Sequence, residues 1–314
     1  MDDLDNQYDQ VSVEGLLVCA GNRRYEMEEQ AHKQVEGLKW DHGALANAKW
    51  TGARLNQVLA RWGLAPLTET NRAEYSKLHV HFECDQKCED DSFYGASVPL
   101  DKAMDPELPI LLAHSMNDEP LTPEHGAPVR LYIPTVIGAR SVKWLQRIIL
   151  RNEESNCFYQ KRDYKVLPPE ATTETKEHYM KVTDAMLEFD MNAAICVPRS
   201  GETILLNDKD SVEVTGYAFG KAVRELAQQL RTDEWVEARL QHEDRLGTTD
   251  AITKKTFTWT LWYAQIKIPA QASFVALVAF CEDINGQRQT VETPYNLRGL
   301  GEGSWSVVKL HVER

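Results

Sequence analysis

The sequence lacks a long apolar run, an N-terminal targeting segment and an excess of positive charge. No apolar stretch approaches the ~20 residues that span a bilayer. The first ten residues, MDDLDNQYDQ, have neither the apolar core of a secretory signal nor the arginines of a transit peptide. Asp and Glu, 48 together, outnumber 35 Lys and Arg, which gives a net charge of −13. A phosphate backbone requires a basic surface, so we expect no nucleic-acid partner. Because no apolar run is long enough to span a bilayer, we also expect no membrane partner. The default is an intracellular, cytoplasmic protein.

Cysteine is also sparse, with six in 314 residues. The six are dispersed along a large chain, which excludes a disulfide scaffold of the kind found in small secreted domains. They are Cys19, Cys84, Cys88, Cys157, Cys196 and Cys281. We therefore expect reduced thiols, at least one of which is available for chemistry.

The first half of the chain mixes strand and helix patterns. The apolar run 11–18 predicts a buried strand that a glycine turn ends. The segment 52–63 predicts a helix, because Leu55, Val58, Leu59 and Trp62 fall at i, i+3, i+4 and i+7. Further strands are predicted at 78–83, 129–134 and 144–150.

The composition changes at 165–176, KVLPPEATTETK, which has the proline, threonine and glutamate content of a linker. Beyond it, short β-rich runs alternate with turns, which is typical of an antiparallel sandwich. These runs are 194–198, 212–219, 257–268, 274–281 and 305–312. The fold class expected is therefore α+β, with a mixed α/β domain at 1–165, a linker at 166–180 and a β-sandwich at 181–314.

The strongest local motif is Cys19-Ala-Gly-Asn-Arg-Arg24, where a cysteine ends a buried strand beside two arginines. Nearby positive charge favours the thiolate over the thiol, and a thiolate binds soft or high-valent metals. The same pattern also suits a nucleophile or a small buried residue before a turn. The residues alone leave these three interpretations open.

Six blocks resemble, in family order, the sulfite oxidase family of molybdopterin enzymes, which includes the molybdenum domain of eukaryotic nitrate reductase. They are CAGNRRYEM, GLKWDHGALANAKWTGARL, YGASVPLDKAM, MNDEPLTPEHGAPVRLYIPTVIGARSVKWLQRI, QKRDYKVLPP and PYNLRGLGEGSWSVVKLHV. The resemblance implies a sulfite-oxidase-type molybdopterin-binding domain at 1–165 without its N-terminal part. It also implies an immunoglobulin-like dimerisation domain at 181–314, and hence a homodimer.

The resemblance also implies residue roles. Cys19 matches the protein ligand to molybdenum. Five residues match family positions around the substrate anion: Arg24, Trp40, Asp163, Tyr164 and Arg298. Six others match family positions that hold the pterin and its phosphate: Asp85, His125, Arg130, Ser141, Val142 and Lys143. Two arginines suit a tetrahedral oxyanion, because each guanidinium can donate two parallel hydrogen bonds. The ordinary alternative for such an arginine is a surface salt bridge.

The function implied is oxidation of sulfite to sulfate by oxygen-atom transfer, with electrons leaving to an external acceptor, a cytochrome or oxygen. No haem module is expected in this chain. The alternatives are a nitrate-reductase-like molybdenum enzyme and a cofactor-free remnant that only dimerises. If a longer chain carries a targeting segment, the resemblance implies the mitochondrial intermembrane space.

Three features depart from the family pattern. Family members carry an arginine and a histidine in a loop before the cysteine strand, whereas residues 1–10 have neither. Part of the cofactor pocket and one substrate arginine are therefore expected to be missing. Glu36 stands where sulfite oxidases tend to have a basic residue, and a carboxylate there disfavours a nearby anion. The family's acidic loop residue near the pterin falls in FECDQ, at Asp85 or Gln86.

A zinc site is a further alternative. His79, His81, Cys84 and Cys88 are spaced H-x-H-x2-C-x3-C, and two histidines on one strand face with two cysteines can bind zinc tetrahedrally. This spacing is less diagnostic than paired CxxC knuckles, and we favour an incidental cluster.

Overall fold

The computed structural model describes residues 2–88, 93–206, 210–220, 223–229, 235–241, 257–283 and 286–313. The chain forms two compact units, each made of more than one segment. The first consists of Met1–Phe189, Gly247–Phe257 and Pro294–Gly301, and the second of Asp190–Leu246, Thr258–Thr293 and Glu302–Arg314. The late segment Pro294–Gly301 thus brings residues of the C-terminal part of the sequence into the first unit.

The first unit contains two antiparallel sheets. The larger has the order β1-β2-β5-β6, with β7 also paired to β5, and the smaller has the order β4-β3-β8. Their bounds are β1 Gln10–Val18, β2 Leu45–Arg54, β3 His79–Cys84, β4 Tyr94–Pro99, β5 Leu111–Met116, β6 Glu119–Pro120, β7 Arg130–Tyr132 and β8 Arg147–Arg151. β1 and β2 pair along their whole length, from Gln10 opposite Ala53 to Val18 opposite Leu45. This register places the ends of the pair, Val18 and Leu45, side by side.

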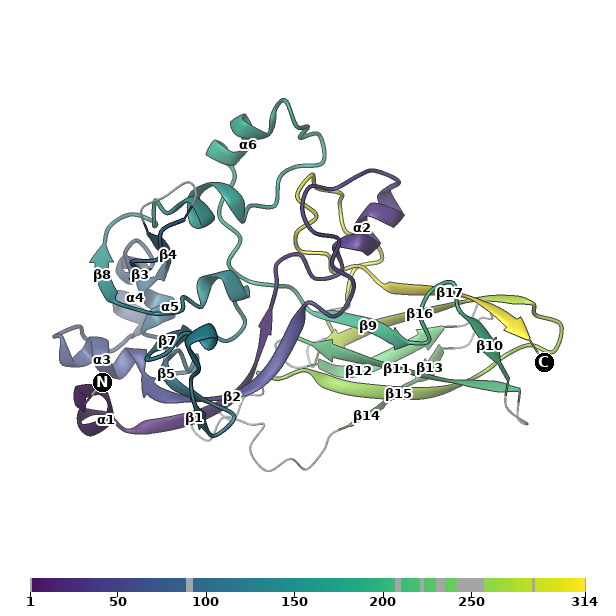
Figure 1. The fold of residues 1–314 in the computed structure, drawn as a ribbon, viewed down its shortest axis with the longest axis horizontal. Helices are drawn as coiled ribbons and strands as arrows, with labels where there is room; N and C mark the ends of the chain where they lie inside the picture. The colour runs from purple at the N-terminus through teal and green to yellow at the C-terminus, as the bar shows by residue number, and fades with distance from the viewer. Residues whose placement is uncertain are drawn as a thin grey trace. The chain divides into compact units, whose positions relative to one another are not determined.

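Short helices connect the strands (Figure 1). They are α1 Asp2–Gln7, α2 Arg24–Ala31, α3 Leu55–Arg61, α4 Glu69–Tyr75, α5 Leu100–Ala103 and α6 Lys176–Val182, with 3-10 turns η1 Pro123–His125 and η2 Gly138–Arg140 and the π turn η3 Tyr159–Asp163. Among the described residues, no helix is long and apolar enough to cross a membrane.

The helix predicted at 52–63 exists, but its predicted start was wrong. β2 continues through Arg54, and α3 begins at Leu55. Gly52 explains the difference, because a Cβ there would lie 2.1 Å from the carbonyl oxygen of Leu112, so this glycine allows β2 and β5 to approach. Gly63, with φ of 97°, follows the helix as expected.

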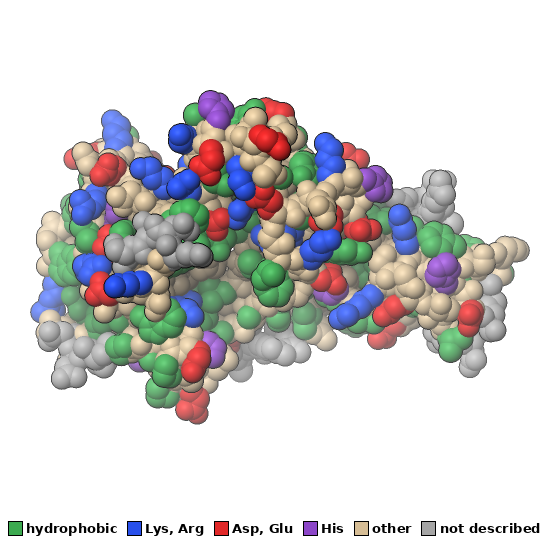
Figure 2. Space-filling model, turned by 45° about the horizontal axis from the view of Figure 1, so that its top comes forward, with side chains coloured by type: hydrophobic (Ala, Val, Ile, Leu, Met, Phe, Trp, Pro, Cys, Tyr) green, Lys and Arg blue, Asp and Glu red, His purple; other side chains and the backbone are tan. Residues whose placement is uncertain are grey.

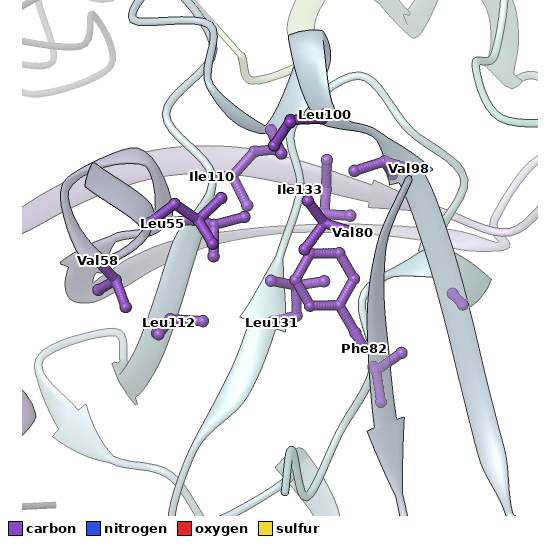
Figure 3. Close-up of a cluster of buried hydrophobic side chains, with 14 of the residues drawn as sticks. Leu55, Val58, Val80, Phe82, Val98, Leu100, Ile110, Leu112, Leu131 and Ile133 are labelled. Carbon is purple, nitrogen blue, oxygen red and sulfur yellow. The ribbon is translucent and has the colours of Figure 1, made fainter. Parts of the chain in front are cut away.

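The main core of the first unit lies where α3, β3, β5 and β7 meet. Figure 3 shows side chains from these elements pointing toward one another. Leu55, Phe82 and Leu131 are fully buried. Burying such a side chain contributes ~1.5–3 kcal/mol each, so this cluster fixes the sheets beneath the loops that carry the site residues.

The second unit consists of a five-stranded sheet, β10-β17-β16-β12-β13, and a four-stranded sheet, β14-β15-β11-β9. Their bounds are β9 Asn192–Val197, β10 Thr203–Leu205, β11 Ser211–Phe219, β12 Val223–Gln229, β13 Trp235–Glu237, β14 Arg239–Leu240, β15 Thr260–Lys267, β16 Phe274–Asp283 and β17 Ser306–Glu313. Side chains along β17 alternate between buried and exposed, and one apolar cluster draws on strands of both sheets. This pattern is that of a β-sandwich.

Two details of the second unit differ from the sequence prediction. The strand expected at 257–268 begins at Thr260, and β10 pairs with β17 in parallel rather than antiparallel orientation. Each of the five β-rich runs nevertheless overlaps an observed strand. The overall class, mixed α/β followed by a sandwich, is confirmed.

The segment predicted as a linker, 166–180, lies within the first unit. Leu167, Ala171 and Met180 are buried there and pack together. The exact boundaries expected for the two domains remain predictions.

Candidate active site

The turn that carries Cys19 is tied to the start of β2. The backbone N–H of Cys19 donates to the Ala44 carbonyl at 2.9 Å, and its own carbonyl accepts from Asn22 at 2.9 Å. The buried side chain of Asn22 accepts from the Ala44 N–H at 2.9 Å. Cys19 itself is partly exposed and forms no disulfide. The long β1–β2 pair thus ends in a rigid turn that presents one thiol.

Glycines enclose the guanidinium of Arg24. A Cβ at Gly21 or Gly37 would lie 2.5 or 2.6 Å from a terminal nitrogen of Arg24, and a Cβ at Gly299 would lie 2.5 Å from its Cγ. The side chain donates to the carbonyls of Leu38 at 2.7 Å and Gly299 at 3.2 Å. Figure 1 shows α2 beside a yellow loop from the C-terminal part of the sequence. The space for this side chain therefore comes from three separate loops.

Burial lowers the pKa of Arg24, while the neighbouring Cys19 and Tyr164 act in the opposite direction. Arg298 and Asp163 also lie within electrostatic range of Arg24. The structure therefore brings together the predicted metal ligand and four of the five predicted anion-site residues.

Arg298 lies between two carboxylates. It pairs with Asp163, and its Nη1 is 3.8 Å from Oε2 of Glu36. Lys176 at the start of α6 lies 3.0 Å from both oxygens of Glu36. The buried Nε of Arg298 has no hydrogen-bond partner among the described residues. This cation is thus held in place while one donor remains available.

Tyr164 directly follows the π turn η3, and the fully buried Arg140 holds this turn. The Arg140 guanidinium donates to the carbonyls of Tyr159 at 2.7 Å and Met186 at 2.9 Å, and it lies 5.7 Å from the Tyr164 ring centroid. Burial raises the pKa of Tyr164 to about 12, with Asp163 and Cys19 adding to the shift. The phenol is therefore neutral near pH 7 and can donate a hydrogen bond.

The predicted cofactor-binding residues converge around Arg130. Its guanidinium donates to the carbonyls of His125 at 3.0 Å and Ser141 at 3.2 Å, and it stacks at 4.8 Å over the ring of Trp50. Lys143 donates to the Glu124 carbonyl at 2.9 Å. Gly126 permits this approach, because a Cβ there would lie 2.9 Å from the Cβ of Lys143. Val142 is buried, and its carbonyl accepts from Leu131.

This cluster fits an anionic cofactor group. Arg130 is only 6% exposed, and burial lowers its pKa to about 10. Within the described part of the chain it forms no ion pair with a carboxylate, and its bonds go to backbone carbonyls. A buried cation without a counter-ion is costly, and a phosphate would supply that counter-ion. Together with the Cys19 thiol, the donor set fits a molybdenum–pterin cofactor.

Other predicted site residues lie apart from these contacts. The Trp40 side chain is 43% exposed, although its carbonyl accepts from Tyr25, next to Arg24. Asp85 is exposed and pairs with Arg147 at 2.6 Å. The roles predicted for Trp40 and Asp85 remain predictions.

The zinc interpretation is not supported. His81 contacts the Glu153 carbonyl at 2.8 Å, and His79 contacts the Ser97 hydroxyl at 3.3 Å. Across the described residues, the one group of three potential metal ligands within 4.8 Å of one another is Glu26, Asp41 and His42. The histidines and cysteines of the spaced motif do not form such a group.

Sequence reasoning missed two residues that shape the site. Arg140 was not among the predicted site residues, and its three carbonyl acceptors lie 19, 24 and 46 positions further along the chain. Glu36 was noted as a departure, but its ion pair with Lys176 joins segments separated by 140 positions. The motif GARSVKW, which contains Arg140, was the one sequence signal that this arginine lies near the site.

The fold and the site define a molybdopterin-binding oxidoreductase domain joined to a dimerisation domain. The family model for the oxidoreductase molybdopterin binding domain matches residues 1–159, and that for the Mo-co oxidoreductase dimerisation domain matches residues 183–313. Human mitochondrial sulfite oxidase is 38% identical over 320 residues, covering 99% of this chain and 54% of that protein. Arabidopsis thaliana sulfite oxidase is 34% identical over 308 residues, covering 96% of this chain and 76% of that protein.

Among solved structures, the sulfane dehydrogenase SoxCD of Paracoccus pantotrophus matches with a TM-score of 0.71 at 21% identity. The match covers 100% of this chain and 74% of that chain, and it supports the fold. The chain belongs to the sulfite oxidase family. It spans about half the length of the mammalian relatives. The family and the two domain types expected from the sequence are confirmed.

Proposed function

We propose that this protein is a molybdenum-cofactor enzyme that oxidises sulfite to sulfate by oxygen-atom transfer. The observation that carries the proposal is the grouping of Arg24, Arg298 and Tyr164 beside the Cys19 thiol. Two guanidinium groups and a neutral hydroxyl suit a small oxyanion, and the thiol suits the metal.

Cys19 would bind the molybdenum through its thiolate. His125, Arg130, Ser141, Val142 and Lys143 would hold the pterin and its phosphate, because Arg130 is a buried cation whose bonded neighbours are backbone carbonyls. The cofactor, when bound, supplies the two-electron redox chemistry and the oxygen atom. The protein's own contribution is to position the substrate and to set the local charge.

Arg24 and Arg298 would bind the sulfite oxygens and stabilise the charge that redistributes as sulfite becomes sulfate. Because the glycines around Arg24 leave it little freedom, its guanidinium is oriented before substrate arrives. Tyr164 would donate a hydrogen bond to the anion, since its raised pKa keeps its proton in place. Asp163 would orient Arg298 through their ion pair.

Two electrons per turnover must then leave the protein. We propose an external acceptor, a cytochrome or oxygen, and a homodimer formed through the dimerisation domain.

The experiment measures molybdenum content and turnover on the same purified protein. We expect bound molybdenum, with sulfite-dependent reduction of ferricyanide. Arg298→Met should retain the metal and reduce kcat/KM for sulfite by at least about 100-fold, because one charged hydrogen-bond donor to the anion is lost.

The control is Arg288→Met, which removes an exposed arginine of the second unit that pairs with Glu282; we expect wild-type turnover. A folded, metal-free dimer would instead support a remnant without activity. Turnover of nitrate with no turnover of sulfite would support the nitrate-reductase-like alternative.

A further inference from the structure

We propose that Glu36 tunes the charge specificity of the anion site, because its carboxylate weakens the binding of doubly charged oxyanions more than that of singly charged ones of the same shape. This inference rests on the proposed function, because it assumes that the anion binds at Arg24 and Arg298. It concerns a residue that the proposed mechanism does not use.

Glu36 is held close to Arg298 by a backbone hydrogen bond and by an ion pair. Its backbone N–H donates to the Leu297 carbonyl at 2.7 Å, directly beside Arg298. Its carboxylate lies 3.8 Å from Nη1 of Arg298. The backbone bond keeps this negative charge close to a predicted anion-binding cation, even when the side chain moves.

The charged side chains around Arg298 sum to a small net positive charge. Three basic side chains, Arg24, Arg298 and Lys176, face two acidic ones, Asp163 and Glu36. These five side chains therefore sum to one net positive charge, and without Glu36 to two. Cys19, whose thiolate would be bound to the metal, is counted with the cofactor. On the face drawn in Figure 2, acidic and basic side chains are likewise mixed rather than gathered into fields of one sign.

The Coulomb energy between Glu36 and a bound anion is proportional to the charge of that anion. Glu36 therefore repels a dianion about twice as strongly as it repels a monoanion. Its side chain and those of Lys176 and Arg298 are each less than a third exposed, so solvent screens this repulsion only in part. The consequence is weaker binding of a doubly charged anion such as sulfate, with a smaller effect on a singly charged anion of the same shape.

The experiment compares sulfate with perchlorate, since both are tetrahedral and they differ by one unit of charge. Calorimetric titration gives Kd for each anion with the wild-type holoprotein and with Glu36→Gln. We expect Glu36→Gln to tighten sulfate binding by about tenfold and perchlorate binding by about threefold. Lys176→Met should act in the opposite direction, weakening sulfate more than perchlorate.

Glu177→Gln is the matched control. It removes the same charge from α6, at the position after Lys176, where Glu177 is exposed and pairs with Arg162. We expect both Kd values to stay within twofold of wild type. If wild type binds sulfate but Glu36→Gln leaves the ratio of the two Kd values unchanged, the inference about Glu36 is overturned. If wild type binds neither anion, or Arg298→Met binds sulfate as tightly as wild type, the anion site itself is overturned, and the proposed function with it.

Discussion

At the scale of single residues, the candidate anion site depends on three glycines, whose lack of a side chain leaves room for Arg24. Arg24 occupies space that Gly21, Gly37 and Gly299 leave open. Gly37 and Gly299 also have positive φ values, of 114° and 56°, which disfavour other residues on conformational grounds. Gly21 has no such requirement, so it separates the effect of space from the effect of backbone strain.

Gly21→Ala should therefore displace the Arg24 guanidinium without unfolding the protein. A Cβ would meet the flexible end of that side chain, its Nη2 at 2.5 Å. We expect about tenfold weaker binding of sulfate, measured by titration, with a Tm close to wild type. Gly43→Ala is the control, since a Cβ there meets no atom within 4 Å. A Gly21→Ala protein with unchanged sulfate affinity would show that the position of Arg24 does not matter.

At the scale of elements, the site is assembled from loops that buried cations join. Arg140, at the end of η2, donates to carbonyls of Tyr159, Tyr164 and Met186. Burial lowers the pKa of Arg140, with Tyr94 and Glu154 acting in the opposite direction. One guanidinium thus satisfies carbonyls at the start of a π turn and directly after it, and joins them to Met186.

Arg140→Met should destabilise the turn that carries Tyr164. Three partly buried carbonyls lose their donor, at ~1–3 kcal/mol for each, so we expect the free energy of unfolding to fall by about 3 kcal/mol. Urea denaturation measures the loss, and hydrogen exchange should show faster exchange at 159–164. Arg147→Met, which removes an exposed arginine paired with Glu83 and Asp85, should have little effect on either measurement. Equal effects of the two variants would contradict this interpretation of Arg140.

At the scale of the whole molecule, the chain combines two separate cores. The first unit buries the cluster around Phe82 and Leu131, and the second buries the cluster around Trp262. The net charge of −13 repels small anions at long range. Buried cations in the first unit therefore have to create the local positive potential that an anionic substrate needs.

Cofactor binding and dimerisation should be separable, because each unit has its own core. Cys19→Ser should lose most of the bound molybdenum, since a hydroxyl is a poor substitute for a thiolate ligand. Analytical ultracentrifugation should still show a dimer. Cys88→Ser, a change at another partly exposed cysteine, should retain both metal and dimer. A monomeric Cys19→Ser protein would show that the cofactor is required for assembly.

Much of this architecture could be predicted from local patterns. The run 11–18 predicted β1, the β-rich runs predicted strands of the second unit, and the ordered blocks identified the family. The start of α3 was wrong, because the end of β2 depends on how closely Gly52 approaches β5, which is a contact between distant segments.

The fold class, the family and the residue types available for an anion and a metal could all be predicted before any contact between distant residues was known. These properties depend on local periodicity and on the order of motifs along the chain. Three further features became visible in the folded molecule alone: Arg298 joins the first unit, Arg140 holds the Tyr164 turn, and Glu36 lies beside Arg298. Each of these depends on contacts between residues far apart in sequence, and such contacts exist only when burial of the first unit's core has brought its loops together.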